Sequence, residues 1–240
     1  MISEAAIWHD LECGSYEADL DCWRTLASDH RGPILDVGAG TGRISLMLAA
    51  LGHEVTALDL DRSLLAALSE RTNGATVETA CADARDFDLQ RSFALIIVPM
   101  LTVQLFGGSA RRAQFLATAA GHLLSGGCLA LAIANLLDDE EGAAGGAVPE
   151  ADVCTVGETS YSTRAVALNQ REGQIGIERR REVATADGSL DVQSATDWID
   201  ALSPEQLEAE GVAAGLKVEQ RRMIPATDEY IGSAVICLGR

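Results

Sequence analysis

The chain has 240 residues, of which 48% are hydrophobic and 22% are charged. That apolar content is enough for a sizeable core, and the length suits one domain with an insertion. The formal net charge of -18 argues against a nucleic-acid partner and against an anionic membrane, since both attract Lys and Arg. No stretch approaches the roughly 18 consecutive apolar residues of a membrane span.

The first 32 residues predict two helices, because apolar side chains recur every three or four positions. Strands and helices then alternate, and the strands are almost continuously Val, Ile and Leu, which predicts a parallel sheet covered on both faces. The expected strands are 34–37, 54–58, 76–80, 93–98 and 128–134, and the expected helices are 43–50, 63–71 and 111–124.

The second half of the chain has a different pattern. Residues 138–152 are acidic and rich in Gly and Ala, which indicates a flexible connection or a mobile lid. Segments 159–168, 174–185 and 189–199 alternate in polarity and predict a small antiparallel insertion. A capped helix starts at Ser203, and segments 217–224 and 233–238 predict a closing hairpin.

These elements predict an α/β fold of the Rossmann-like type, with a seven-stranded, mostly parallel sheet and an antiparallel C-terminal hairpin. Residues 1–240 then form a single domain. Its expected parts are a helical cap (1–32), a nucleotide-binding core (33–137), a flexible loop with the antiparallel insertion (138–200), and a last helix with the closing hairpin (201–240).

A glycine-rich turn follows the first strand, with the sequence Asp36-Val37-Gly38-Ala39-Gly40-Thr41-Gly42. A strand, a glycine turn and a helix together form a site for a nucleotide-like ligand. The pattern departs from the dinucleotide fingerprint, because Arg43 stands where its last glycine belongs. The carboxylate of Asp36 would repel a pyrophosphate but suits a ligand that carries an ammonium and a sulfonium. A dehydrogenase that uses NAD is therefore disfavoured.

This turn resembles the first motif of the class I S-adenosylmethionine-dependent methyltransferases, and three later blocks continue the resemblance. They are Asp59 at the end of the second strand, the segment 82–87 with Asp83, and the fourth strand with the turn at 123–129. The resemblance covers about residues 33–134, and the N-terminal stretch from Trp8 to Tyr16 is similar to bacterial small-molecule methyltransferases.

The resemblance implies S-adenosyl-L-methionine as the cofactor and assigns its binding residues. The methionine end would contact the glycine turn, Asp59 would bind both ribose hydroxyls, and Asp83 would accept from the adenine amino group. The predicted cofactor-binding residues are Asp36, Gly38, Ala39, Gly40, Gly42, Asp59, Leu60, Ala82, Asp83, Ala84, Val98 and Pro99. Next to Asp83, we expect Asp86 to have no ligand role and only to act as a cap or to bond Arg85, and we expect Phe87 to lie in the core.

The resemblance also implies a small-molecule methyl acceptor beyond the fourth strand, methylated on N or O. Candidate acceptor-side residues are His9, Tyr16 and Gln104, with Tyr161, Arg164 and Tyr230 expected to be mainly structural. The basic run Arg179 to Arg181 is expected to pair with nearby glutamates; the alternative is that it holds a carboxylate or phosphate of the substrate. His53 and His122 are expected to be structural, and no metal site is expected from the spacing of His and Cys.

Two alternatives stay open at this point. The fold could perform aminopropyl transfer from the decarboxylated donor, or it could be a non-catalytic S-adenosylmethionine-binding module. No secretory signal is recognisable, and the six cysteines are scattered without a C-x-x-C pair. The sequence therefore predicts a cytoplasmic protein with reduced thiols, as a monomer or homodimer.

Overall fold

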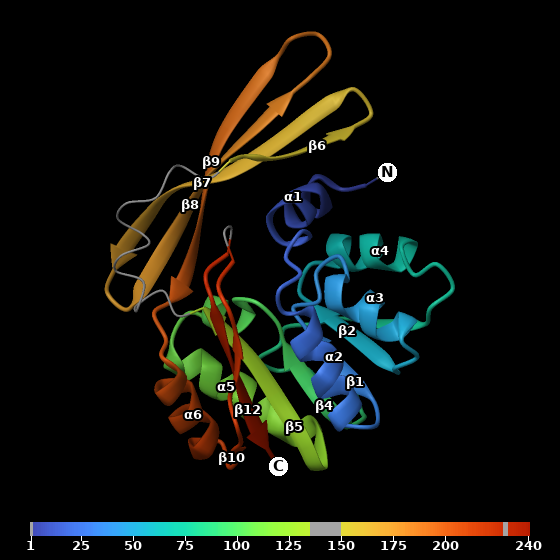
Figure 1. Cartoon of the computed structure of the whole chain (residues 1–240), viewed down its shortest axis with the longest axis vertical. Coiled ribbons are helices and arrows are strands. Elements are labelled where there is room, and N and C mark those ends of the chain that lie inside the picture. The colour runs from blue at the N-terminus through green and yellow to red at the C-terminus, as the bar shows by residue number, and fades with distance from the viewer. Residues whose placement is uncertain (1, 135–149, 228–229) are drawn as a thin grey trace.

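The computed structural model describes residues 2–134, 150–227 and 230–240, and it contains two sheets (Figure 1). The larger sheet has the order β10-β12-β5-β4-β1-β2-β3, with β11 also paired to β12. Its strands are β1 (Ile34–Val37), β2 (Val55–Asp59), β3 (Val77–Cys81), β4 (Phe93–Val98), β5 (Leu123–Ala134), β10 (Lys217–Val218), β11 (Arg222–Ile224) and β12 (Ser233–Gly239). The predicted fold class is confirmed.

Seven helices accompany the sheets in the described part of the chain. They are α1 (Glu4–Cys13), α2 (Leu20–Asp29), α3 (Arg43–Ala50), α4 (Arg62–Glu70), the 3-10 helix η1 (Thr102–Phe106), α5 (Ser109–His122) and α6 (Pro204–Ala213). The predicted cap of α6 is present, since Ser203 and Gln206 form a capping box. Among these residues, no helix has the length and apolar run that crossing a bilayer requires.

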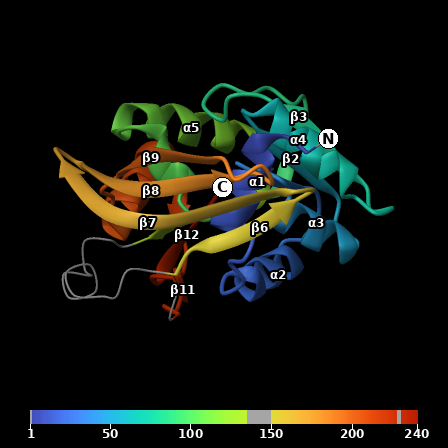
Figure 2. The ribbon, with the colours of Figure 1, turned by 90° about the horizontal axis from the view of Figure 1, so that it is seen from above.

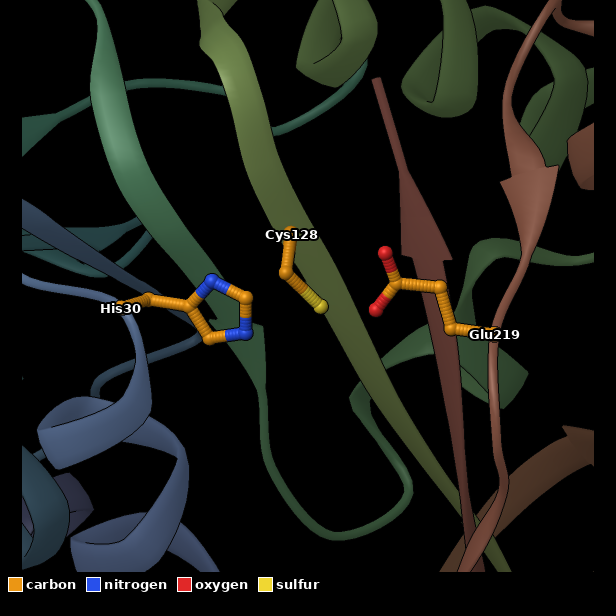
Figure 3. Close-up of side chains that lie close together, drawn as sticks. All are labelled: His30, Cys128 and Glu219. Atoms are coloured by element: carbon orange, nitrogen blue, oxygen red, sulfur yellow. The ribbon is translucent and has the colours of Figure 1, made fainter.

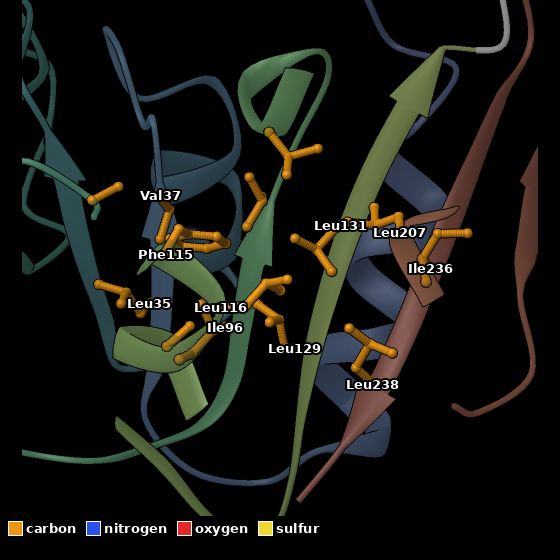
Figure 4. Close-up of a cluster of buried hydrophobic side chains, with 14 of the residues drawn as sticks. Leu35, Val37, Ile96, Phe115, Leu116, Leu129, Leu131, Leu207, Ile236 and Leu238 are labelled. Carbon is orange, nitrogen blue, oxygen red and sulfur yellow. The ribbon is translucent and has the colours of Figure 1, made fainter. Parts of the chain in front are cut away.

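Both faces of the inner strands β1 and β4 are buried, which explains their continuously apolar sequences, whereas the edge strand β3 is mostly exposed. Alternate side chains of β1 point in opposite directions: Leu35 packs with Phe115 of α5 in one cluster, and Ile34 packs with Trp23 of α2 in the other. Figure 4 shows the first cluster, which includes Phe115 of α5 and Leu207 of α6. Phe87 belongs to this cluster, as the sequence predicts.

The closing edge of the sheet differs from the prediction of one strand over 217–224. This segment is broken into β10 and β11, which both pair with β12. Between the paired residues Val218 and Arg222 the chain advances four residues, while the partner strand advances only from Leu238 to Val235. One extra residue therefore forms a bulge, and the seven strand positions of the prediction are retained.

The end of α5 was also predicted wrongly. The helix stops at His122, and β5 begins at Leu123 instead of residue 128. Leu123 pairs with Phe93, and the next pairing joins Leu95 to Cys128. The residues between Leu123 and Cys128 therefore interrupt the regular pairing with β4. Because this segment contains Gly126 and Gly127, the sequence predicts a simple turn there.

The second sheet is the predicted antiparallel insertion, but it has a fourth strand. Its order is β6 (Asp152–Val156), β7 (Thr159–Arg171), β8 (Gln174–Ala184) and β9 (Leu190–Asp200). The prediction missed β6, a short and mostly exposed edge strand. Most of the predicted flexible connection 138–152 lies outside the described residues. In the view from above (Figure 2), this sheet extends across the core, and Figure 1 places it beyond α1.

Helix α1 lies between the insertion and the core and contacts both. Its Glu12 accepts hydrogen bonds from Arg181 of β8 (Nε to Oε1, 2.8 Å) and from Thr163 of β7 (Oγ1 to Oε1, 3.0 Å). Its Asp10 pairs with Arg71 after α4 (Nη1 to Oδ1, 2.9 Å). Helix α1 therefore connects the insertion to the end of α4 in the core.

Candidate active site

The glycine turn between β1 and α3 is shaped by close neighbours. Gly38 and Gly40 adopt φ values of +71° and +55°, which residues with a Cβ rarely adopt. A Cβ on Gly40 would lie 2.1 Å from Nε2 of His9, and one on Gly38 would lie 2.5 Å from a methyl of Thr102. Both glycines are needed because α1 and η1 approach the turn so closely.

Asp36 is the buried carboxylate of this turn, with an exposed fraction of 0%. Its Oδ2 accepts a hydrogen bond from Ser45 Oγ (2.7 Å), and its Oδ1 has no partner among the residues that the structure describes. Burial raises the pKa of this carboxyl to about 6. A buried oxygen without a donor, in the wall of a cavity, fits a ligand ammonium group.

Asp59 ends β2 next to the turn. Its Oδ2 accepts from the Gly40 amide (2.8 Å) and its Oδ1 from the Asp61 amide (2.8 Å). Each carboxylate oxygen can accept a further hydrogen bond, so the side chain fits two adjacent hydroxyl groups.

The carboxylate of Asp83, which follows β3, already binds an arginine. Arg85 binds it through its guanidinium (Nε to Oδ1, 2.8 Å) and its backbone amide (2.9 Å). This pairing lowers the pKa of Asp83 to about 2. The bond between Asp86 and Arg85, one of the two roles expected for Asp86, does not form among the described residues, because the Arg85 side chain turns back and binds Asp83.

A cavity of about 510 Å³ joins these groups, a size typical of ligand sites. Nine predicted cofactor positions line it: Asp36, Gly38, Ala39, Asp59, Leu60, Ala82, Asp83, Ala84 and Pro99. Gly40 and Gly42 shape the turn without lining the cavity, and Val98 is fully buried in the core cluster. Val98 therefore does not fit a direct contact with a ligand.

The cavity continues beneath the insertion. Its far part is lined by α1, by the segment after β4 with η1, and by side chains of β8 and β9. Asp197 and Ile199 were not predicted as site residues. The signal that could have found them is the period-two alternation along β9, which places both side chains on one face of the sheet. Glu12 and Cys13 of α1 also line this part.

Among the three catalytic candidates, His9 is the one that lines the cavity. Its Nδ1 lies 3.2 Å from Thr41 Oγ1, and its ring covers Gly40. Burial lowers the pKa of His9 in spite of the nearby carboxylates of Asp10 and Asp59. The imidazole is consequently neutral at neutral pH and able to accept a proton.

Gln104 and Tyr16 are placed away from the cavity and do not fit the roles predicted for them. The Gln104 amide bonds backbone groups: Nε2 donates to the Asp200 carbonyl (3.0 Å), and Oε1 accepts from the Ala134 amide (2.9 Å). Tyr16 is buried against Tyr230, with ring centroids 4.8 Å apart. Both side chains hold elements together.

The other candidates on the insertion differ in their partners and in whether they line the cavity. Tyr161 packs edge-on against Trp8, with ring centroids 5.4 Å apart, and does not line the cavity, as is also true of Arg164. Arg180 pairs with the nearby Glu182, as predicted, whereas Arg181 pairs with the distant Glu12 of α1. Arg179 lines the cavity and has no such pairing in the described part of the chain. His122 is structural, since its Nε2 accepts a hydrogen bond from the Leu89 amide (3.3 Å).

One cluster of metal-ligating types lies elsewhere. His30, Cys128 and Glu219 bring their ligand atoms within 4.8 Å of one another, although their spacing in the sequence predicts no metal site (Figure 3). The adjacent cavity is also lined by Arg222, whose positive charge opposes a metal cation there. None of the three residues lines the cavity of the glycine turn.

Comparison with known proteins supports this assignment of the core. Residues 34–127 match the family described as a methyltransferase domain. A curated relative, an rRNA adenine N-6-methyltransferase from Corynebacterium diphtheriae, is 32% identical over 72 residues, which are 30% of this chain and 28% of the relative. The chain thus spans little more than a quarter of that protein.

Two solved structures share the fold across nearly the whole chain. The sugar N-methyltransferase KedS8 from Streptoalloteichus has a TM-score of 0.75 and 20% identity, covering 100% of this chain and 94% of that one. CalS10 from Micromonospora echinaspora, an amino pentose methyltransferase with S-adenosylmethionine bound, has a TM-score of 0.70 and 22% identity, covering 96% of each chain. The chain therefore shares its fold with these two methyltransferases, as the sequence predicts, and its residues 34–127 match the methyltransferase domain family.

Proposed function

We propose that this chain transfers the methyl group of S-adenosyl-L-methionine to an amino nitrogen of a small molecule of the amino-sugar type. The observation that carries the proposal is the single cavity, which runs from Asp36 and Asp59 to the inner face of the insertion. The likeness to a sugar N-methyltransferase and an amino pentose methyltransferase extends over the insertion as well as the core, and it supports this acceptor class.

The donor half of the cavity fits the cofactor in charge and hydrogen bonding. The free Oδ1 of Asp36 would hold the methionine ammonium, and the carboxylate of Asp59 would hold the ribose hydroxyls. Asp83 would accept a hydrogen bond from the adenine amino group while it stays bound to Arg85. The cofactor supplies an activated methyl group, so the protein has to position the acceptor and exclude water.

An amine acceptor is protonated at neutral pH and must lose a proton before it attacks the methyl carbon. Neutral His9, in the cavity wall, is the candidate to accept that proton. We expect His9→Gln to lower kcat for an amine acceptor, with the Kd for S-adenosylmethionine within about threefold of the parent. A comparable loss in donor affinity would instead make His9 a donor-binding residue.

An RNA substrate is disfavoured, although one relative methylates rRNA adenine. The match to that relative covers 72 residues, and RNA-binding surfaces depend on an excess of Lys and Arg that this chain, at a net charge of -18, does not have. A small acceptor that enters the cavity needs no such surface.

Calorimetry with S-adenosylmethionine, S-adenosylhomocysteine, decarboxylated donor and NAD tests the donor. We expect the first two to bind; tighter binding of decarboxylated donor would favour aminopropyl transfer, and binding of NAD alone would contradict the proposal. A second assay measures S-adenosylhomocysteine formed with aminohexoses and with matched hexoses that carry a hydroxyl at the same carbon. Turnover of the amines but not of the hydroxyl partners is expected, and donor binding without any turnover would indicate a non-catalytic module.

A further inference from the structure

Three consecutive arginines on β8 have different surroundings. Arg180 pairs with Glu182 on the same strand (Nε to Oε1, 2.8 Å), and Arg181 pairs with Glu12 of α1 (Nη2 to Oε2, 2.7 Å). Arg179 has no hydrogen bond or ion pair with any residue in the described part of the chain, although it is half-buried and lines the cavity. Within the described residues its guanidinium therefore lies in the cavity wall without a bound acceptor, and Asp152 of β6 is close enough to interact with it electrostatically.

The register of the insertion places an acid next to this arginine. Ile177 pairs with Asp197 and Arg179 pairs with Ala195, so Arg179 and Asp197 are diagonal neighbours on one face of the sheet. Both line the cavity, yet no ion pair joins them. The two groups remain available to a ligand, one as a donor and the other as an acceptor.

Other arginines in the cavity wall are already used or lie at the donor end. Arg43 is bound by both oxygens of Asp19 (2.6 and 2.7 Å), and Arg85 is bound by Asp83. Arg111 lies close enough to Asp83 to help lower its pKa. Arg179 is thus the cation that faces the part of the cavity beneath the insertion.

We propose that Arg179 recognises an oxyanion of the methyl acceptor, a carboxylate or a phosphate, so that the acceptor is an amine that also carries an acidic group. A guanidinium binds such groups through two parallel hydrogen bonds, and the concave, partly desolvated wall strengthens them. This inference rests on the proposed function, because the donor groups of β1 and β2 define which part of the cavity receives the acceptor.

The test uses inorganic phosphate and acetate as probes, titrated into the full chain saturated with S-adenosylhomocysteine, at constant ionic strength. Binding is followed by NMR through amide shifts of β8 and β9. We expect saturable binding in the parent protein and a Kd at least about tenfold higher in Arg179→Gln, the loss expected for a charge-assisted hydrogen-bonded pair. Tighter binding of phosphate than of acetate would indicate a phosphorylated acceptor, and the reverse order a carboxylated one.

Arg180→Gln is the matched control, because it removes the same charge from the next residue, on the opposite face of the strand. Its Kd for both probes is expected to equal that of the parent, and Asp197→Asn is expected to bind them as tightly or more tightly. The inference is overturned if neither probe saturates, or if Arg179→Gln and Arg180→Gln behave alike. Binding of S-adenosylhomocysteine is measured in the same samples, so failure of the donor site is seen separately.

Discussion

Asp36 gives a prediction that connects stability, pH and donor binding. The folded protein raises the pKa of this buried carboxyl from 3.8 to about 6. The folded chain therefore keeps the proton at a pH where the unfolded chain has released it, and stability is lost as the pH rises from about 4 to about 6. At about 1.4 kcal/mol per pH unit, the loss reaches about 3 kcal/mol at pH 7.

The variant Asp36→Asn has no carboxyl group at this position, so it lacks this pH-dependent loss of stability. We expect the difference in unfolding free energy between the variant and the parent to change by about 2.4 kcal/mol in favour of the variant between pH 4 and pH 7. Urea denaturation of the ligand-free proteins at each pH measures it, and the subtraction cancels other titrating groups. A difference that stays constant over this range would refute the burial argument.

Donor binding should have the opposite pH dependence. If the ionised carboxylate holds the methionine ammonium, the parent should bind S-adenosylmethionine about tenfold more weakly at pH 5 than at pH 7, and Asp36→Asn should bind weakly at both. Ser45→Ala is the matched control, since it keeps the carboxyl but removes the hydrogen bond that lowers its pKa. Its transition should move to higher pH, and an unchanged midpoint would contradict the assignment.

Three further outcomes follow from the contacts. Asp59→Ala should weaken S-adenosylmethionine binding at least about 100-fold by calorimetry, because two charged hydrogen bonds to the ribose and one to the Gly40 amide are lost; an unchanged Kd would remove the ribose assignment. Arg112→Ala should cost about 3–5 kcal/mol in urea denaturation, since it leaves two largely buried carboxylates without a cationic partner, and a cost under about 1 kcal/mol would contradict it. Gly40→Ala should lower the melting temperature, because its Cβ collides with His9, and His9→Ala should restore part of the loss.

The core and the glycine turn could be predicted because their signals are local. The glycine turn, its strand and its helix occupy adjacent residues, and a buried parallel strand is recognisable from its own composition. The fourth insertion strand β6 was missed because it is short, mostly exposed and paired along one edge. Such a strand gains its structure from its neighbour, and its own sequence carries little of that information.

The side-chain pairings could not be predicted because they depend on contacts between distant parts of the chain. The sequence suggests that the arginines of β8 pair with nearby glutamates, yet Arg181 pairs with Glu12, 169 residues away. That contact depends on how α1 packs against the insertion. Gln104 failed as a candidate for the same reason, because its backbone partners come from β5 and from the end of β9.

Helix α1 links the two halves of the cavity through residues that follow one another within a single turn. His9 covers Gly40, Asp10 accepts from Thr41 (Oγ1 to Oδ1, 2.6 Å), and Glu12 binds Arg181. The donor turn and the strand that carries the proposed acceptor site are thus held by the same short helix. A rigid movement of α1 away from the glycine turn would therefore also stretch the contact between Glu12 and Arg181.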